Sequence, residues 1–304
     1  MWVALLSTLA LAAADVCEQC RVDPRRTVLC STHLDEELTT LREERSVLAR
    51  SKESSERLAA LQRIAALTST HSNAPSPNVA RLLADGLHDE SLMVRRRALA
   101  LLMDGQHRDE TIKGVIDGWR AAQRSWREFD ARMSLVASEL SKGSSTMSRQ
   151  DIEEWPAYIE ALLAALGDVH DERAYKELLG VFKWPADRTP GRFYVAAARA
   201  ALTVESRKGV ESVLEFTLTL EAEIAAGRVP ARFGPSTSLL GAMMRPLDNA
   251  VAHDVEDVFA ALVAFARHKK TAPPPDPVMG AASAWRAWFK AAKDQFTERM
   301  TLLE

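Results

Sequence analysis

The chain has 304 residues and a formal net charge of −3 at pH 7, and it is 47% hydrophobic and 27% charged. These fractions are typical of a globular protein with a sizeable core, and they exclude a largely disordered chain. The small negative charge excludes a general attraction to nucleic acid or to an anionic membrane. Aromatic residues make up only 6% of the chain, whereas alanine and leucine are abundant, which favours helices over strands.

Residues 1–14 are predicted to be an export signal. The run from Trp2 to Ala14 contains only apolar and small residues, and it is too short for a bilayer span, which needs about 20 helical residues. The three alanines that end the run offer small residues at a cleavage site, although no Lys or Arg precedes the run. A buried N-terminal helix is the alternative. We therefore expect an exported protein, periplasmic or secreted, without a transmembrane span.

Residues 15–33 contain all three cysteines and are predicted to form a small Cys/His tip. Cys17, Cys20, Cys30 and His33 follow the pattern C-x2-C-x9-C-x2-H, which could supply four ligands to one tetrahedral zinc ion. In an oxidising compartment, Cys30 could instead form a disulfide with Cys17 or Cys20. Free thiols are a third possibility, and the sequence leaves all three open.

From residue 34 onward the sequence pattern is helical almost throughout. Residues 34–53 contain one apolar stripe of leucines on a charged helix. Similar Ala- and Leu-rich segments then begin at residues 60, 94, 159 and 195, and each is followed by a second apolar helix. Steps of about 35 residues with two helices per unit predict stacked helical hairpins. The longer middle step is explained by a helical insertion near residues 118–143.

Two stretches of sequence resemble HEAT repeats. LHDESLMVRRRALALL resembles a HEAT-repeat helix junction, and IEALLAALGDVHDERAYKELLGVF resembles the bacterial HEAT-like form. The resemblance covers residues 54–270 and implies an all-α fold, an α-solenoid of HEAT-like hairpins. It also implies that Asp89, Asp168 and Asp171 cap helix N-termini and that Arg95 and Arg173 pair with neighbouring turns.

The C-terminal part is predicted to be a Pro-rich linker, residues 271–277, followed by a Trp-rich helix within residues 278–304. Trp285, Trp288 and Phe289 share one face of this amphipathic helix. The helix either caps the end of the solenoid or binds a partner.

The sequence contains no hydrolase, nucleotide-binding or metalloprotease signature, so no catalytic residue is predicted. His88 and His170 precede Asp at related repeat positions and are interpreted as turn residues. One surface cluster on the insertion helix and the helix before it is a candidate partner-binding site, although its tryptophans could instead pack inward: Arg95, Arg96, Trp119, Arg120, Arg124, Trp126 and Arg127.

We expect a non-catalytic binding or scaffold protein that presents a curved helical surface to a protein partner outside the cytoplasm. Two alternatives belong to other classes. One is an enzyme, or an enzyme subunit, with an unrecognised site in the solenoid groove. The other is a nucleic-acid binder that uses the Arg/Trp helix. Apart from the zinc ion, no cofactor and no small-molecule substrate is inferred.

Overall fold

The computed structural model describes residues 31–70, 77–105, 108–140, 149–184, 191–204, 206–226 and 282–295. Every regular element in these residues is helical, which confirms the prediction of an all-α chain. The helices are α2 (Ser31–Arg50), α3 (Ser54–Thr70), α4 (Pro77–Asp85), η1 (Gly86–His88), α5 (Leu92–Asp104), α6 (Arg108–Leu140), α7 (Arg149–Asp168), α8 (Glu172–Gly180), η2 (Val181–Lys183), α9 (Gly191–Thr203), α10 (Arg207–Ala225), α13 (Ala282–Ala292) and η3 (Lys293–Gln295).

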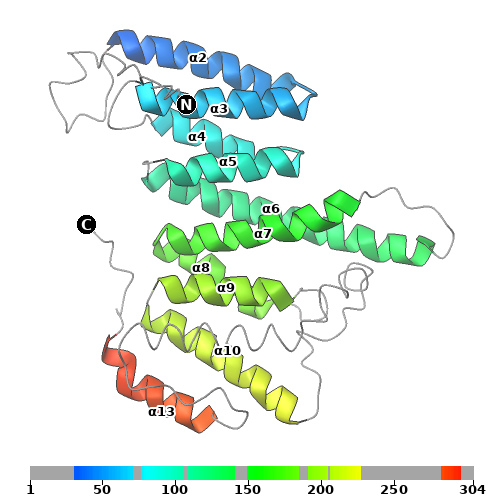
Figure 1. Cartoon of the computed structure of the whole chain (residues 1–304), viewed down its shortest axis with the longest axis vertical. Helices are drawn as coiled ribbons and strands as arrows, with labels where there is room; N and C mark the ends of the chain where they lie inside the picture. Colours follow the sequence, from blue (N-terminus) through cyan, green and yellow to red (C-terminus); the bar gives the residue numbers. More distant parts are fainter. Residues whose placement is uncertain are drawn as a thin grey trace, which may run out of the picture.

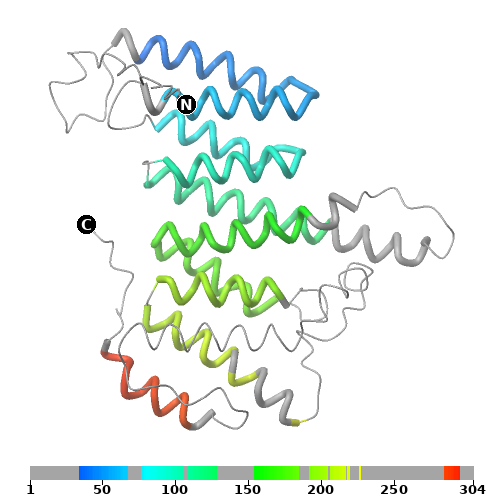
Figure 2. The backbone as a smooth tube through the Cα atoms, viewed as in Figure 1, coloured from blue at the N-terminus to red at the C-terminus, as the bar shows by residue number. Residues whose placement is uncertain are grey.

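The helices between α3 and α9 lie in two rows. Helices α3, α5, α7 and α9 pack against one another in chain order and form the first row (Figure 1). Helices α4, α6 and α8 form the second row, and each packs against the first-row helices beside it. Helix α2 packs against α3 and α4 at one end, while α10 packs against α9 and α13 at the other. Figure 2 follows the same stack from α2 in blue to α13 in red.

The segments that are similar in sequence occupy equivalent places in this stack. Ala60–Leu67, Val94–Leu101, Ile159–Leu166 and Val195–Leu202 lie in α3, α5, α7 and α9, which are the first-row helices. The second apolar helix that follows each segment in the sequence is α4, α6, α8 or α10. The insertion prolongs α6, which runs as a single helix of 33 residues to Leu140.

One hydrophobic core runs through the whole stack. It extends from Leu41 in α2 to Ala292 in α13, and small residues let neighbouring helices approach closely. A Cβ atom added to Gly114 of α6 would lie 2.7 Å from the Cβ of Ala84 in α4, so glycine is required for this approach. Leucine and alanine, the commonest residues of the repeated segments, are buried in every first-row helix: Ala60, Leu61, Ala98, Leu99, Leu102, Leu162, Leu163, Leu166, Ala197, Ala198 and Ala201.

Helix α13 turns its tryptophans inward. The side chains of Trp285 and Trp288 are 0% and 7% exposed and belong to the common core, and the helix packs on α10. Arg207 of α10 donates a hydrogen bond to the carbonyl oxygen of Lys293 at 3.1 Å and pairs with Asp294 at 3.1 Å. Part of the Trp-rich face is therefore already used inside the fold. The Pro-rich linker, residues 271–277, lies outside the described residues.

Candidate binding groove

The two tryptophans of the predicted surface cluster are core residues. The side chain of Trp119 is fully buried and stacks on Trp184, with ring centroids 5.5 Å apart and an interplanar angle of 5°. Trp126 is 4% exposed and meets Phe193 edge to face at 5.1 Å. These indoles join α6 to the turn after α8 and to α9. Because stacking on a base requires an accessible ring, their burial removes the aromatic part of a nucleic-acid surface.

The arginines of the same cluster do not share one surface. Arg120 lies on α6 and pairs with Glu177 of α8 at 2.7 Å. Arg124 and Arg127 are exposed farther along α6, whereas Arg96 is exposed on α5 in the first row. Arg95 is buried. The cluster therefore divides into a packing stripe, exposed cations on two different rows, and one internal arginine.

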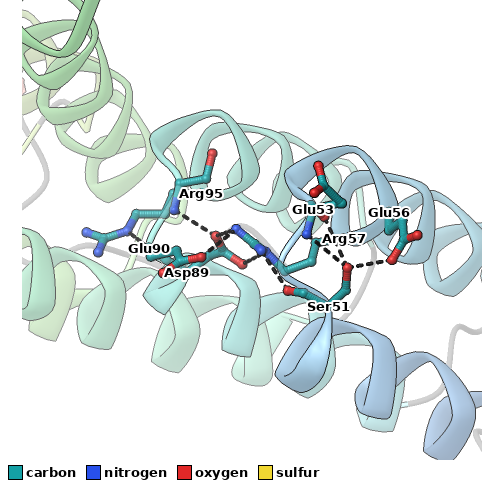
Figure 3. A network of polar contacts seen from close by, with 8 residues as sticks. Ser51, Glu53, Glu56, Arg57, Asp89, Glu90 and Arg95 are labelled. Atoms are coloured by element: carbon teal, nitrogen blue, oxygen red, sulfur yellow. Dashed lines mark hydrogen bonds and ion pairs between the residues drawn. The ribbon is translucent and has the colours of Figure 1, made fainter. Parts of the chain in front are cut away.

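Arg95 belongs to a polar network between α3 and α5 (Figure 3). At its centre, Arg57 of α3 donates from Nε to one oxygen of Asp89 at 2.8 Å and from Nη2 to the other at 3.1 Å. The side chains are only 4% and 8% exposed. Arg57 also donates to the carbonyl oxygen of Ser51 at 2.8 Å, and its Nη2 lies 3.2 Å from Glu90. This buried ion pair ties α3 to the turn before α5.

Arg95 connects the same turn to the next first-row helix. Its Nε donates to the carbonyl oxygen of Asp89, and its guanidinium lies 5.4 Å from the ring centre of Trp155 in α7. Among the described residues, its buried Nη1 has no hydrogen-bond partner. Near Arg95, burial raises the pKa of Tyr158, whose hydroxyl donates to the carbonyl oxygen of Leu87 at 3.4 Å. Arg95 is thus a buried residue of α5 that contacts both the turn before α5 and helix α7.

The turn residues predicted from the HEAT resemblance behave differently from one another. Asp171 caps α8, because its Oδ1 accepts from the backbone amide of Arg173 at 2.8 Å. The Arg173 side chain and this amide lower the pKa of Asp171. Asp89 was also expected to cap a helix, but the N-cap of α5 is Ser91, and Asp89 instead accepts from the backbone amide of Ser91 at 2.7 Å. Asp168 was expected to cap a helix N-terminus, but it is the last residue of α7 and caps none.

The two turn histidines are not at equivalent positions, contrary to the prediction. His88 ends η1, in the connection from the second row to the first. His170 lies between α7 and α8, in the connection from the first row to the second, and has a φ of 47°. The similar letters LHDES and VHDER therefore belong to different kinds of turn, because a short polar loop before a helix has the same composition in both places.

The predicted zinc ligands are not part of the described site. Cys17, Cys20 and Cys30 lie outside the described residues, and so does the side chain of His33, whose backbone belongs to the first turn of α2. Among the residues that the structure describes, no three His, Cys, Asp or Glu side chains gather in a way that could hold a metal ion.

A groove that the sequence did not reveal lies on the second-row side, over α4. Helix α4 has 9 residues, about 14 Å, whereas its neighbours α2 and α6 have 20 and 33 residues, about 30 and 50 Å. Residues of all three helices line the groove, with α4 between the α2 wall and the α6 wall. The groove has a volume of about 530 Å³, within the common range for binding sites. Its apolar floor includes Leu82 of α4 and, from the adjoining α2, Leu38 and Leu41.

The charged side chains of the groove are not all paired. Arg81 lies 3.3 Å from Glu110, and Asp117 lies 3.9 Å from Arg120. Four other charged side chains line the groove without an ion pair or hydrogen bond to another described residue: the cations Arg42, Arg45 and Lys113, and the anion Asp85. All four are exposed. The unpaired charge of the groove is thus positive, in a chain whose net charge is negative.

A second hollow, of about 400 Å³, lies on the first row between α7 and α9. Two of its charged side chains pair with each other, because Arg192 donates hydrogen bonds to both carboxylate oxygens of Glu160. Its floor is formed by alanines, including Ala164, Ala196 and Ala200. The hollow therefore offers fewer free recognition groups than the groove over α4.

The chain matched no protein-family model, and comparison with curated proteins and with solved structures gave no match either. None of the helices in the described ranges is both long and apolar enough to cross a membrane.

Proposed function

We propose that the chain is an exported HEAT-like α-solenoid that binds a protein partner along its second row. The observation that carries the proposal is the groove over α4, whose apolar floor and unpaired charges combine the features of a protein-recognition surface. A stack of helix pairs suits this role, because each pair adds to an extended rigid surface. The pairing of similar segments with α3, α5, α7 and α9 supports the solenoid interpretation.

Site-specific photo-cross-linking tests this proposal. A photoreactive amino acid replaces His88 or Asp117 at the groove, and Arg97 or Ala100 on the first row serves as the matched control. All four positions are exposed. In cells of the source organism, we expect one protein adduct of constant mass at the groove positions and none at the control positions. Equal adducts on both rows, or no adduct at either groove position, would refute the proposal.

The export signal and the Cys/His tip are part of the same proposal. Cell fractionation and N-terminal sequencing test export, since a mature chain outside the cytoplasm beginning at Asp15 is expected. A cytoplasmic chain that retains Met1 would contradict it. Metal analysis with thiol counting on the mature chain decides between the tip structures. One zinc ion with three reactive thiols identifies the zinc site, and one thiol without zinc identifies the disulfide.

A further inference from the structure

We infer that the groove over α4 takes an acidic amphipathic segment of the partner protein. This inference rests on the proposed function and specifies the chemistry of the partner. The groove has a wall on each side, because α2 and α6 both contact α4 and both contribute lining residues. A segment that lies along α4 therefore meets side chains from both walls at once.

The floor accounts for the apolar side of such a segment. Leu41 and Leu82 are each 6% exposed, and Leu38 is half-buried beside them. At the α6 wall, Gly114 packs closely against Ala84 of α4, so this wall stands directly beside the floor. An amphipathic helix that lays its apolar residues into a groove uses this kind of surface, with anchors spaced by one helical turn. The length of α4 matches two to three turns of the bound helix, at about 5.4 Å per turn.

The rim accounts for the acidic side. Arg42 and Arg45 lie on the α2 wall and Lys113 on the α6 wall, and none of them is engaged by another described residue. Arg81 is already paired with Glu110, so it adds no free charge. Asp85 is the unpaired anion between the walls. Carboxylates on both flanks of a bound helix would neutralise cations that are exposed and have no ion pair with another described residue, and this complementarity would steer association.

Binding of designed peptides to the full chain tests the inference. The probe is a fluorescein-labelled helical peptide of about three turns with leucines on one face and glutamates on its flanks. A control peptide has the same sequence with glutamine at every glutamate position. Fluorescence anisotropy is measured at low and high salt. We expect the acidic peptide to bind at least tenfold more tightly than the glutamine peptide at low salt, with the difference shrinking as salt screens the charges.

Charge substitutions locate the binding. Arg42→Glu with Arg45→Glu should weaken the acidic peptide at least tenfold, and Lys113→Glu should weaken it severalfold from the opposite wall. Asp85→Lys should strengthen it, a gain that misfolding does not produce. The matched control is Arg96→Glu with Arg97→Glu, the same charge change at exposed positions of the first row, for which we expect less than a twofold effect.

Several results would overturn the inference. These are equal binding of the acidic and glutamine peptides, an equal loss in the first-row control, or no gain for Asp85→Lys. Complete displacement by free glutamate or citrate at the peptide's concentration would identify a site for small anions instead. If the groove positions cross-link to a partner while the acidic peptide shows no preference, the proposed function stands and this inference fails. If the peptide binds as expected while no partner adduct forms, the proposed function fails.

Discussion

The buried pair of Arg57 and Asp89 should be one of the most sensitive polar contacts in the stack. Removing one partner of a buried ion pair typically costs about 3–5 kcal/mol, because the other charge stays buried and unpaired. The loss expected from each single substitution depends on which hydrogen bonds remain to the charge that is left. In Arg57→Met, Asp89 keeps only the amide of Ser91, so we expect a loss of about 4–5 kcal/mol. In Asp89→Asn, Arg57 keeps Ser51 and Glu90, so we expect about 3 kcal/mol.

The double substitution separates the pair from its individual residues. With both charges gone, no buried ion is left unpaired, so Arg57→Met with Asp89→Asn should cost at least about 2 kcal/mol less than the sum of the single losses. The measurement is equilibrium urea unfolding followed by circular dichroism, with the slope checked for each variant. The control is the exposed pair of Arg286 and Glu215, whose side chains are 58% and 57% exposed. Its removal should cost about 0–1 kcal/mol.

Two results would refute this reasoning. If Arg57→Met costs less than about 1 kcal/mol, the pair behaves as an exposed one. If the double loss equals the sum of the single losses within about 0.5 kcal/mol, the two side chains act independently and the ion pair does not stabilise the junction.

The same unfolding assay checks three further predictions. Gly209→Ala should lower the free energy of unfolding by about 2 kcal/mol or more, because its Cβ would lie 1.5 Å from the Tyr175 hydroxyl. The control is Gly180→Ala, which has open space and should be neutral or slightly stabilising. Equal effects of the two substitutions would contradict this prediction. Because the pKa of Asp171 is lower in the folded chain, its stabilisation is complete above about pH 5 and disappears as the pH falls through the folded-state pKa. Asp171→Asn should therefore destabilise at about pH 7, and its effect should shrink as the pH falls, so a loss that does not change with pH would exclude the ion pair as its cause. Trp119→Ala should cost about 3–5 kcal/mol if the indole is a core residue, and less than about 1 kcal/mol would place it at the surface.

Tyr175 offers a separate test at alkaline pH. Burial raises its pKa to about 12, and the hydrogen bond from the Ser206 hydroxyl, 2.8 Å long, lowers it to a smaller extent. Since folding favours the neutral phenol, its contribution is present below the unfolded-state pKa, about 10, and falls as the pH rises toward 12. Tyr175→Phe should remove this part of the alkaline loss of stability. If the free energy of unfolding of Tyr175→Phe falls at alkaline pH as steeply as that of the unsubstituted chain, Tyr175 ionises in the folded chain as it does in the unfolded one.

Periodicity alone located most of the helices, because leucine and alanine occupy the buried positions of each first-row helix. The same rule applies to the tryptophans. Trp119, Ala122 and Trp126 are spaced by three and four residues, as expected for one face of a helix, and all three are buried. Arg120, Arg124 and Arg127 form the opposite, exposed stripe. The interpretation that the tryptophans pack inward is therefore confirmed, and the candidate cluster combined residues from two faces of α6.

The groove and the buried ion pair could not be predicted from the sequence, for a different reason. Arg57 finds its partner 32 residues away, in a turn whose position depends on how α3 and α5 stack. A lone arginine in a helix is otherwise expected at the surface. The groove depends on how α2 and α6 pack on either side of α4 and on the close approach that Gly114 permits. The ion pair and the groove both result from packing between helices, so no local sequence pattern predicts them.

The order of helix contacts gives α2 an unusual role. From α2 to α10, each described helix packs mainly against helices one or two places away in the chain, so stability is built up between neighbours. Helix α2 contacts α3 and α4, contributes one wall of the groove and is the first helix of the part of the chain that the structure describes. A ligand held by both walls would restrain local opening of α2. Amide hydrogen exchange in α2 should therefore report how much of the groove is occupied.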